Sequence, residues 1–226
     1  MEAILLRENL YRIEDEHVRC FLAIGNEKAL LIDAGINAGL KSFIETLTNK
    51  PVQLVLTHAD PDHFASASEF ESVMMHPAEM AQFSSRNNTT MCLVSVWENE
   101  ILEVGDFCFE IIQISGHTPG SIAFLERSKR FLISGDSVSL VPVFMFGNGR
   151  NLDAYRASLN KLRRLNSCFD VVFGSHGETE IEPSLIDELL ELALRIKNDE
   201  IKGETVARFD HKVKIYQHKR AQIFFL

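Results

Sequence analysis

The chain has no apolar run that approaches the ~20 residues of a membrane-spanning helix, so we expect no such segment. It also lacks an excess of positive charge, because 23 lysine and arginine residues face 32 aspartate and glutamate residues, a formal net charge of −9. Long-range electrostatics therefore does not favour nucleic acid or an anionic membrane as a partner. The composition, 46% hydrophobic and 24% charged, is that of an ordinary globular protein.

Cysteine is scarce and forms no C-x-x-C motif, since the residues are Cys20, Cys92, Cys108 and Cys168. This spacing does not indicate a metal-binding or redox pair. Cys20, Cys108 and Cys168 lie in or beside apolar runs, which predicts buried free thiols. The first twenty residues carry acids early and no long apolar core, so they do not resemble a secretory signal. A reducing cytoplasm is the expected location.

Short strands and amphipathic helices alternate along the chain. Helical spacing of apolar residues predicts helices over residues 40–47, 77–83, 152–165 and 183–196. Apolar runs predict strands over residues 52–56, 72–75, 107–114, 121–125, 130–134 and 170–173, with further strands before residue 35 and after residue 203. No linker or repeat divides the chain. Strands followed by helices occur twice, which favours one α/β domain over residues 1–226 with two facing sheets and helices outside.

Four places in the sequence share one pattern, a short apolar strand that leads into a loop with histidine or aspartate. The sequences are LVL before THADPDH, IIQI before SGHTPGS, FLIS before GDS, and VVF before GSHG. Catalytic residues commonly lie on loops that a rigid scaffold holds at strand ends. Glycines beside three of these loops permit tight turns. The seven candidate ligands are His58, Asp60, Asp62, His63, His117, Asp136 and His176.

These residue types point to metal binding. Imidazole suits zinc, iron and related ions, and carboxylates add hard oxygen ligands. Seven groups are too many for one tetrahedral ion and suit two ions bridged by a carboxylate. Two ions ~3.5–4 Å apart can share a hydroxide and polarise a substrate oxygen. We therefore expect two divalent metal ions as cofactors, with zinc first and iron or manganese as alternatives.

The motifs H-A-D-P-D-H, G-H-T-P-G-S, S-G-D and G-S-H-G, in this order, resemble those of the metallo-β-lactamase-fold hydrolases, including their glyoxalase II-like branch. The resemblance implies a four-layer αββα sandwich, of mixed α/β or α+β class. It also implies that His58, Asp60 and His117 hold the first ion. The second ion would then take Asp62, His63 and His176, with Asp136 as the bridge. The fold serves many reactions, so the resemblance does not identify a substrate.

Asp60 departs from the family pattern, which has histidine at this position of H-x-H-x-D-H. One interpretation is that the first metal site is lost, and the other is that Asp60 is itself a ligand. Imidazole Nδ1 and carboxylate Oδ are both bonded to Cγ, so they reach about equally far from the backbone. With a third aspartate, the cluster of two divalent ions, one hydroxide and the carboxylates would have a net charge near zero. We expect a weaker Lewis acid and a shift toward harder ions such as manganese or ferrous iron.

The leading function is a dinuclear metal-dependent hydrolase of a small-molecule ester, thioester or lactone. A metal-bridging hydroxide would attack the substrate, with Asp62, His117 and Asp136 as the catalytic residues. Flavodiiron proteins also have an acid at this motif position, so one alternative is a di-iron oxidoreductase that needs a separate flavin partner. The other alternative is a non-catalytic metal or ligand sensor. The partner expected is a small-molecule substrate, and a homodimer stays open.

Segment 140–156 follows Asp136 and carries aromatic residues. Phe144, Phe146 and Tyr155 are candidate substrate-pocket residues, and core packing is the alternative for each. Residues 84–97 form either a lid or an ordinary surface loop, with the second favoured.

Overall fold

The structure is a computed structural model that describes residues 1–86, 91–209 and 211–226. Its contacts divide the chain into two compact units, Met1–Ile112 and Gln113–Leu226, called unit 1 and unit 2 below. The single domain over residues 1–226 stays a prediction.

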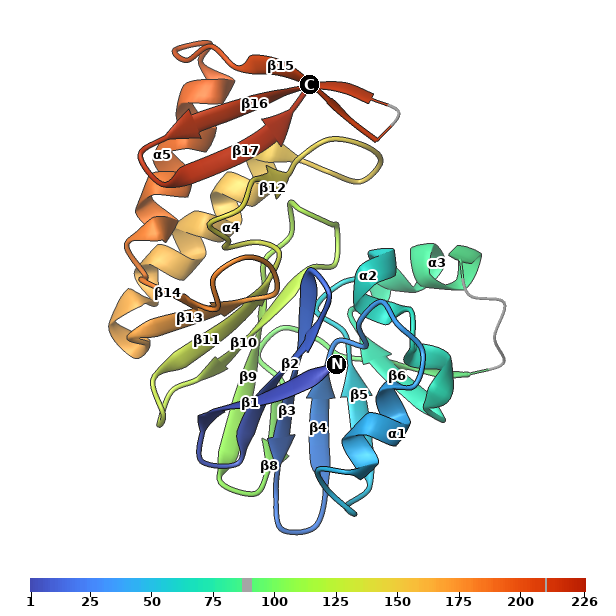
Figure 1. The fold of residues 1–226 in the computed structure, drawn as a ribbon. Helices are drawn as coiled ribbons and strands as arrows, with labels where there is room; N and C mark the ends of the chain where they lie inside the picture. The colour runs from blue at the N-terminus through green and yellow to red at the C-terminus, as the bar shows by residue number, and fades with distance from the viewer. Residues whose placement is uncertain (87–90, 210) are drawn as a thin grey trace. The chain divides into compact units, whose positions relative to one another are not determined.

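Unit 1 is built on a sheet whose strands lie in chain order from β1 to β7 (Figure 1). The strands β1 to β4 pair antiparallel, whereas β4 to β7 pair parallel. β3 and β4 are almost wholly buried apolar runs, as expected for strands covered on both faces. The bounds are β1 (Glu2–Arg7), β2 (Leu10–Asp15), β3 (Val18–Ile24), β4 (Ala29–Ile32), β5 (Val52–Val55), β6 (Ser72–Met75), β7 (Cys92–Ser95), α1 (Leu40–Glu45), α2 (Pro61–Phe64), a 3₁₀ turn (Ala67–Glu69) and α3 (Pro77–Arg86).

A second antiparallel pair, β8 (Ile101–Val104) and β9 (Phe107–Gln113), ends unit 1, and β9 crosses the boundary between the units by one residue. Burial alternates along the start of β9, because Phe107 and Phe109 point inward while Cys108 between them is exposed. The prediction of a buried Cys108 is therefore wrong. That of a buried Cys20 is confirmed.

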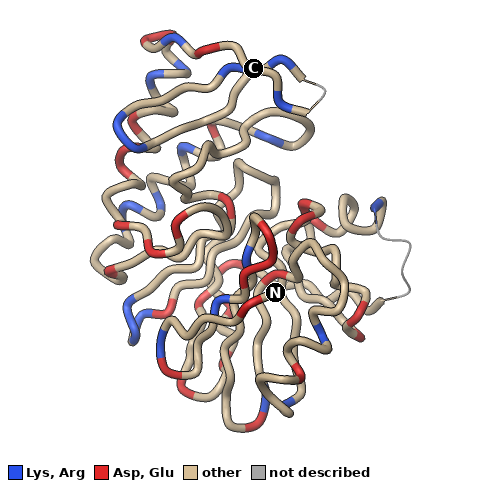
Figure 2. The backbone as a smooth tube through the Cα atoms, viewed as in Figure 1, with Lys and Arg blue, Asp and Glu red and all other residues tan. Residues whose placement is uncertain are grey.

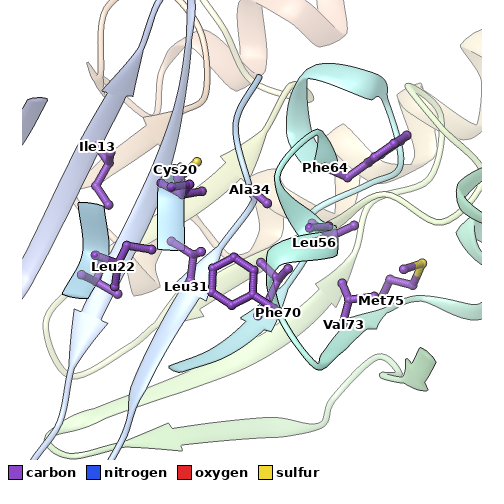
Figure 3. Close-up of a cluster of buried hydrophobic side chains, with 14 of the residues drawn as sticks. Ile13, Cys20, Leu22, Leu31, Ala34, Leu56, Phe64, Phe70, Val73 and Met75 are labelled. Carbon is purple, nitrogen blue, oxygen red and sulfur yellow. The ribbon is translucent and has the colours of Figure 1, made fainter. Parts of the chain in front are cut away.

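The core of unit 1 anchors the loops that leave the carboxyl ends of its parallel strands. Figure 3 shows Leu22 and Leu31 of the sheet close to Leu56 and Phe70, which come from the chain on either side of α2. Phe64 of α2 is part of the same cluster and meets Phe83 of α3 edge-on, with 5.1 Å between ring centroids. The apolar residues that flank the H-A-D-P-D-H segment thus fix both of its ends.

Unit 2 has a sheet part in the order β14-β13-β11-β10 and a separate sheet in the order β12-β17-β16-β15. The helices α4 and α5 lie side by side, and α5 also packs on β16 and β17 (Figure 1). The bounds are β10 (Ile122–Glu126), β11 (Phe131–Gly135), β12 (Val143–Phe144), α4 (Leu152–Arg164), a 3₁₀ turn (Asn166–Cys168), β13 (Val171–Gly174), β14 (Glu180–Ile181), α5 (Leu185–Lys197), β15 (Glu204–Arg208), β16 (His211–His218) and β17 (Ala221–Phe225).

Charge is unevenly distributed in the sequence of unit 2. Lysine and arginine recur from the end of β15 to the turn between β16 and β17 (Figure 2). Arg220 at the β16–β17 turn binds Glu188 and Glu182, which ties this turn to α5 and the residues before it. The basic residues of the tail therefore help to attach its sheet to the helix.

The predicted helices and strands are largely confirmed, with shifts at their ends. α1 stops at Glu45, two residues before the last apolar position of its pattern, and α5 begins at Leu185 rather than at Pro183. In the segment predicted as a lid or surface loop, residues 84–86 end α3 and residues 92–95 form β7, while residues 87–90 lie outside the described part. Among the residues that the structure describes, we find no helix with the length and hydrophobicity of a membrane span.

Candidate metal centre

Four candidate ligands leave one edge of the unit 1 sheet. β4 and β5 run parallel with Ile32 opposite Val55, so both strands end at the same edge. Asp33 comes directly after β4, and its backbone N–H donates to the carbonyl of Val55 at 2.9 Å. The chain after β5 carries Thr57 and His58 past Asp33. Ligands in open α/β sheets bind outside such carboxyl ends.

Asp33 organises this edge from a fully buried position. Its Oδ1 accepts the backbone N–H of Thr57 at 2.7 Å, and its Oδ2 lies 2.8 Å from Nδ1 of His63. The Thr57 hydroxyl donates to the same carboxylate, at 2.8 Å from Oδ2. Asp33 has a left-handed backbone with φ of 66°, which is uncommon outside glycine and is held here by these bonds.

These bonds fix the protons on two histidines. A carboxylate only accepts, so His63 carries its proton on Nδ1 and keeps a lone pair on Nε2. The Thr57 hydroxyl donates its one hydrogen to Asp33. It also lies 2.9 Å from Nδ1 of His58, so it accepts a hydrogen bond from that nitrogen. Asp33 therefore orients both imidazoles so that Nε2 is the nitrogen with a lone pair, directly for His63 and through Thr57 for His58.

Each of these Nε2 atoms faces a carboxylate within unit 1. Nε2 of His58 lies 3.5 Å from Oδ2 of Asp60, and Nε2 of His63 lies 3.9 Å from Oδ2 of Asp62. Asp60 precedes the short helix α2, and Asp62 and His63 lie on it. The two imidazole rings are 4.1 Å apart between centroids. Both histidines are buried, and the two aspartates are partly exposed.

The other three candidate ligands leave one edge of the sheet in unit 2. β11 and β13 run parallel with Gly135 opposite Gly174, so Asp136 and His176 follow strands that end at the same edge. β10 runs antiparallel to β11, so the loop with His117, which precedes β10, belongs to this edge as well. The topology of each sheet thus gathers its own set of ligands.

Asp136 lies between the two histidines of unit 2. Its Oδ1 is 3.2 Å from Nε2 of His176, and its Oδ2 is 3.6 Å from Nε2 of His117. Nδ1 of His117 donates to the backbone carbonyl of Phe144 at 2.9 Å, because a carbonyl oxygen can only accept. His117 therefore also presents Nε2 with a lone pair, and each oxygen of Asp136 faces a different imidazole.

The residue types suit a metal ion, and so do the distances between the histidine nitrogens and the carboxylate oxygens. Bonds of 2.0–2.1 Å at tetrahedral angles place neighbouring ligand atoms ~3.3 Å apart. The four histidine–carboxylate distances run from 3.2 to 3.9 Å, near that value, and three of the four are longer than a good hydrogen bond. The spacing of these groups within each unit is therefore compatible with ligands of a metal ion.

A comparison with protein families decides the relationship. The model described as "Metallo-beta-lactamase superfamily" matches residues 13–176, which is more than half of the chain. The chain belongs to the metallo-β-lactamase superfamily.

Curated relatives in this superfamily include enzymes that cleave thioesters by name. Hydroxyacylglutathione hydrolase GloC of Haemophilus influenzae is 34% identical over 141 residues, covering 52% of this chain and 65% of that protein. Acyl-coenzyme A thioesterase MBLAC2 of Gallus gallus is 26% identical over 171 residues, covering 59% of this chain and 61% of that protein. The chain thus spans less than two thirds of either relative. These names support the prediction of a hydrolase.

Solved structures confirm the fold. A metallo-β-lactamase from Pontibacter korlensis matches with a TM-score of 0.72 and 19% identity, covering 85% of this chain and 98% of that one. A metallo-β-lactamase family protein from Thermus thermophilus matches with a TM-score of 0.70 and 20% identity, covering 86% of this chain and 82% of that one. The predicted family and the predicted metallo-β-lactamase fold, an α+β sandwich, are therefore both confirmed.

The candidate pocket residues of this superfamily member lie among packed side chains. Tyr155 is fully buried on α4, and its hydroxyl donates to the carbonyl of Ser137 at 2.7 Å, next to Asp136 in sequence. Its burial raises the pKa of the phenol well above the usual range. Phe146 is buried with Phe224, and Phe144 packs against them while its carbonyl holds His117. For Tyr155 these contacts favour core packing, and the pocket role of all three stays a prediction.

Asp33 is a residue of the candidate site that sequence reasoning missed. It lies in LLIDAG, where an acid two residues before glycine is typical of a turn residue. The available signal was that an acid directly follows a wholly apolar strand, as Asp136 does. His76 directly precedes α3, and its Nδ1 accepts the backbone N–H of Ala78 in the first turn of that helix.

Proposed function

We propose that the chain is a dinuclear metal-dependent hydrolase of a small-molecule thioester, ester or lactone. The observation that supports it most is the orientation of the imidazoles. His58, His63 and His117 each have a defined acceptor for Nδ1–H, so Nε2 faces a carboxylate with a lone pair available. Imidazoles held in this way are typical of metal ligands, whose outer nitrogens are bound by carboxylates or carbonyls.

In this proposal His58, Asp60 and His117 would hold the first ion. Asp62, His63 and His176 would hold the second ion, and Asp136 would be shared by the two. The division of the Asp136 oxygens between His117 and His176 supports a bridging role, because a bridging carboxylate gives one oxygen to each ion. The proposal requires the ligand loops of unit 1 to meet those of unit 2.

The bound ions would supply a nucleophilic water at neutral pH and would polarise the carbonyl that is attacked. The chain's own residues supply orientation. Asp33 and Thr57 keep His58 and His63 in the tautomer with Nε2 unprotonated, and the Phe144 carbonyl does the same for His117. Asp60 adds a negative charge where the family's usual motif has a neutral imidazole. We therefore expect zinc, iron and manganese to compete for the first site.

Among the three substrate classes, thioesters are favoured by the printed names of the relatives, a hydroxyacylglutathione hydrolase and an acyl-coenzyme A thioesterase. The di-iron oxidoreductase is the second candidate, and the carboxylate at position 60 is the observation in its favour. The cytoplasmic location and the homodimer stay predictions.

The test is hydrolysis of a panel of thioesters, esters and lactones by protein loaded with zinc, iron or manganese in turn. We expect turnover of at least one thioester, with a loss of at least about a hundredfold in Asp136→Asn, since that change removes the bridging charge. Asp153→Asn, a change of the same chemistry on the exposed face of α4, should leave turnover intact. Folded, metal-loaded protein that cleaves no member of the panel would refute the proposal. Reduction of oxygen by the iron form with an external reductant would favour the second candidate.

A further inference from the structure

The helix α3 holds the segment that carries Asp60, the acid that replaces the family's histidine. Oε2 of Glu79 accepts the backbone N–H of Ala59 at 2.8 Å, and the side chain of Glu79 is buried. Nε2 of Gln82 donates to the carbonyl of Ala59 at 2.8 Å. Residues three apart lie on one face of a helix, so Glu79 and Gln82 both point from that face of α3 toward Ala59 and bind its two peptide groups. Both polar groups of Ala59 are therefore bound by α3.

Gln82 also reaches the side chain of Asp60. Its Nε2 lies 3.2 Å from Oδ1 of Asp60, while the other oxygen, Oδ2, lies 3.5 Å from Nε2 of His58. Both partners of the Gln82 amide nitrogen, a carbonyl and a carboxylate, can only accept, so the amide must present its N–H₂ group to them. The two oxygens of Asp60 consequently have different neighbours, an amide donor at Oδ1 and an imidazole ligand atom at Oδ2.

We propose that Gln82 is a positioning residue that assigns Oδ2 of Asp60 to the metal and keeps the carboxylate from binding through both oxygens. The proposal rests on the metal site described under the proposed function. A histidine at position 60 would offer one ligating nitrogen in a fixed place, whereas a carboxylate can rotate about its Cβ–Cγ bond and exchange or combine its oxygens. A neutral amide donor at Oδ1 prevents that rotation without cancelling the negative charge that the ion requires.

The first experiment replaces Gln82 by methionine, which has nearly the same length and no N–H donor. Zinc and manganese affinities are measured by competition with a chromophoric chelator. We expect Gln82→Met to bind the ion at the Asp60 site about tenfold less tightly, the lower end of the effect of removing a residue that orients a ligand. Gln217→Met makes the same chemical change at an exposed side chain of the C-terminal hairpin and should leave both affinities unchanged.

A double-mutant cycle separates the Asp60 contact from the Ala59 contact. In an Asp60→His background the carboxylate is gone but the Ala59 carbonyl remains, so Gln82→Met should no longer weaken metal binding. If the tenfold loss persists there, Gln82 acts only on the backbone and the inference is wrong.

The affinities also distinguish failure of this inference from failure of the proposed function. Wild-type protein that binds no ion would overturn both. Normal binding by wild type, with unchanged affinity in Gln82→Met, would overturn the role of Gln82 alone. Thermal unfolding of the same variants without metal checks that each one folds.

Discussion

Asp33→Asn is the substitution that tests the arrangement of the imidazoles most sharply, because it keeps the shape of the side chain and removes one acceptor. The oxygen of the new amide can still accept the backbone N–H of Thr57. Its N–H₂ group would then replace Oδ2, which now lies 2.8 Å from both the Thr57 hydroxyl and Nδ1 of His63. His63 would face a donor with its own N–H, unless its proton moves to Nε2.

The proton shift is confined to His63. The Thr57 hydroxyl also lies 3.0 Å from Oδ1, the position of the new amide oxygen, so it can still donate there and accept from Nδ1 of His58. If His63 carries its proton on Nε2, it has no lone pair there for a metal. Loss of an orienting partner costs about 10–100-fold in metal affinity. In addition, a lost hydrogen bond to a charged group lowers the free energy of unfolding by about 1.5–3 kcal/mol.

The assay combines chelator competition for zinc with urea unfolding of the metal-free protein. Glu126→Gln is the matched control, since Glu126 is fully buried and accepts from Ser128 at the end of β10 away from the His117 loop. It should lower the free energy of unfolding without changing zinc affinity. Asp33→Asn with the zinc affinity of wild type would show that Asp33 does not set the tautomer of His63.

Three further changes test other parts of the account. Asp60→His should raise the zinc content relative to manganese and lower the pH at which activity rises, because the cluster gains positive charge; identical metal content and pH profile would contradict this. Gly116→Ala should lower the free energy of unfolding by about 1–3 kcal/mol, since φ is +142° and a Cβ would lie 2.5 Å from the backbone nitrogen of Tyr155; a variant as stable as wild type in urea would refute it. Burial raises the pKa of Asp15, but hydrogen bonds from the side chain and backbone of Asn37 outweigh it and leave the pKa below 3.8. The lowered pKa means that the stabilisation by ionised Asp15 is present above pH 3.8 and is lost as the pH falls further. The difference in unfolding free energy between wild type and Asp15→Ala should therefore shrink below that pH. A difference that grows on acidification would contradict the lowered pKa.

The ligand loops could be predicted from the sequence because each follows a short apolar strand and the residue types are local. His58 and His63 follow parallel strands of the unit 1 sheet, and Asp136 and His176 follow parallel strands of the unit 2 sheet, so each pair starts from one edge of its own sheet. The role of Asp33 could not be predicted in this way. It depends on the register of β4 against β5, two strands that a helix separates in the sequence. Contacts of this kind are not visible in a local pattern.

Other features were missed for different reasons. The exposure of Cys108 follows from the period of two along β9, so the sequence contained that signal and it was overlooked. The position of Tyr155 on the apolar face of α4 was predictable, but not what that face packs against. Gln82 lies on a helix 22 residues beyond Asp60, and nothing in the spacing indicates that its amide reaches that carboxylate.

The central claim is that the seven side chains hold a pair of ions, and native mass spectrometry of the folded, zinc-loaded protein counts these ions directly. The account predicts two ions per chain in wild type and one in each of His63→Ala and His117→Ala, which remove ligands of different ions. A folded wild-type protein that retains no ion, or the same count in all three proteins, would contradict it.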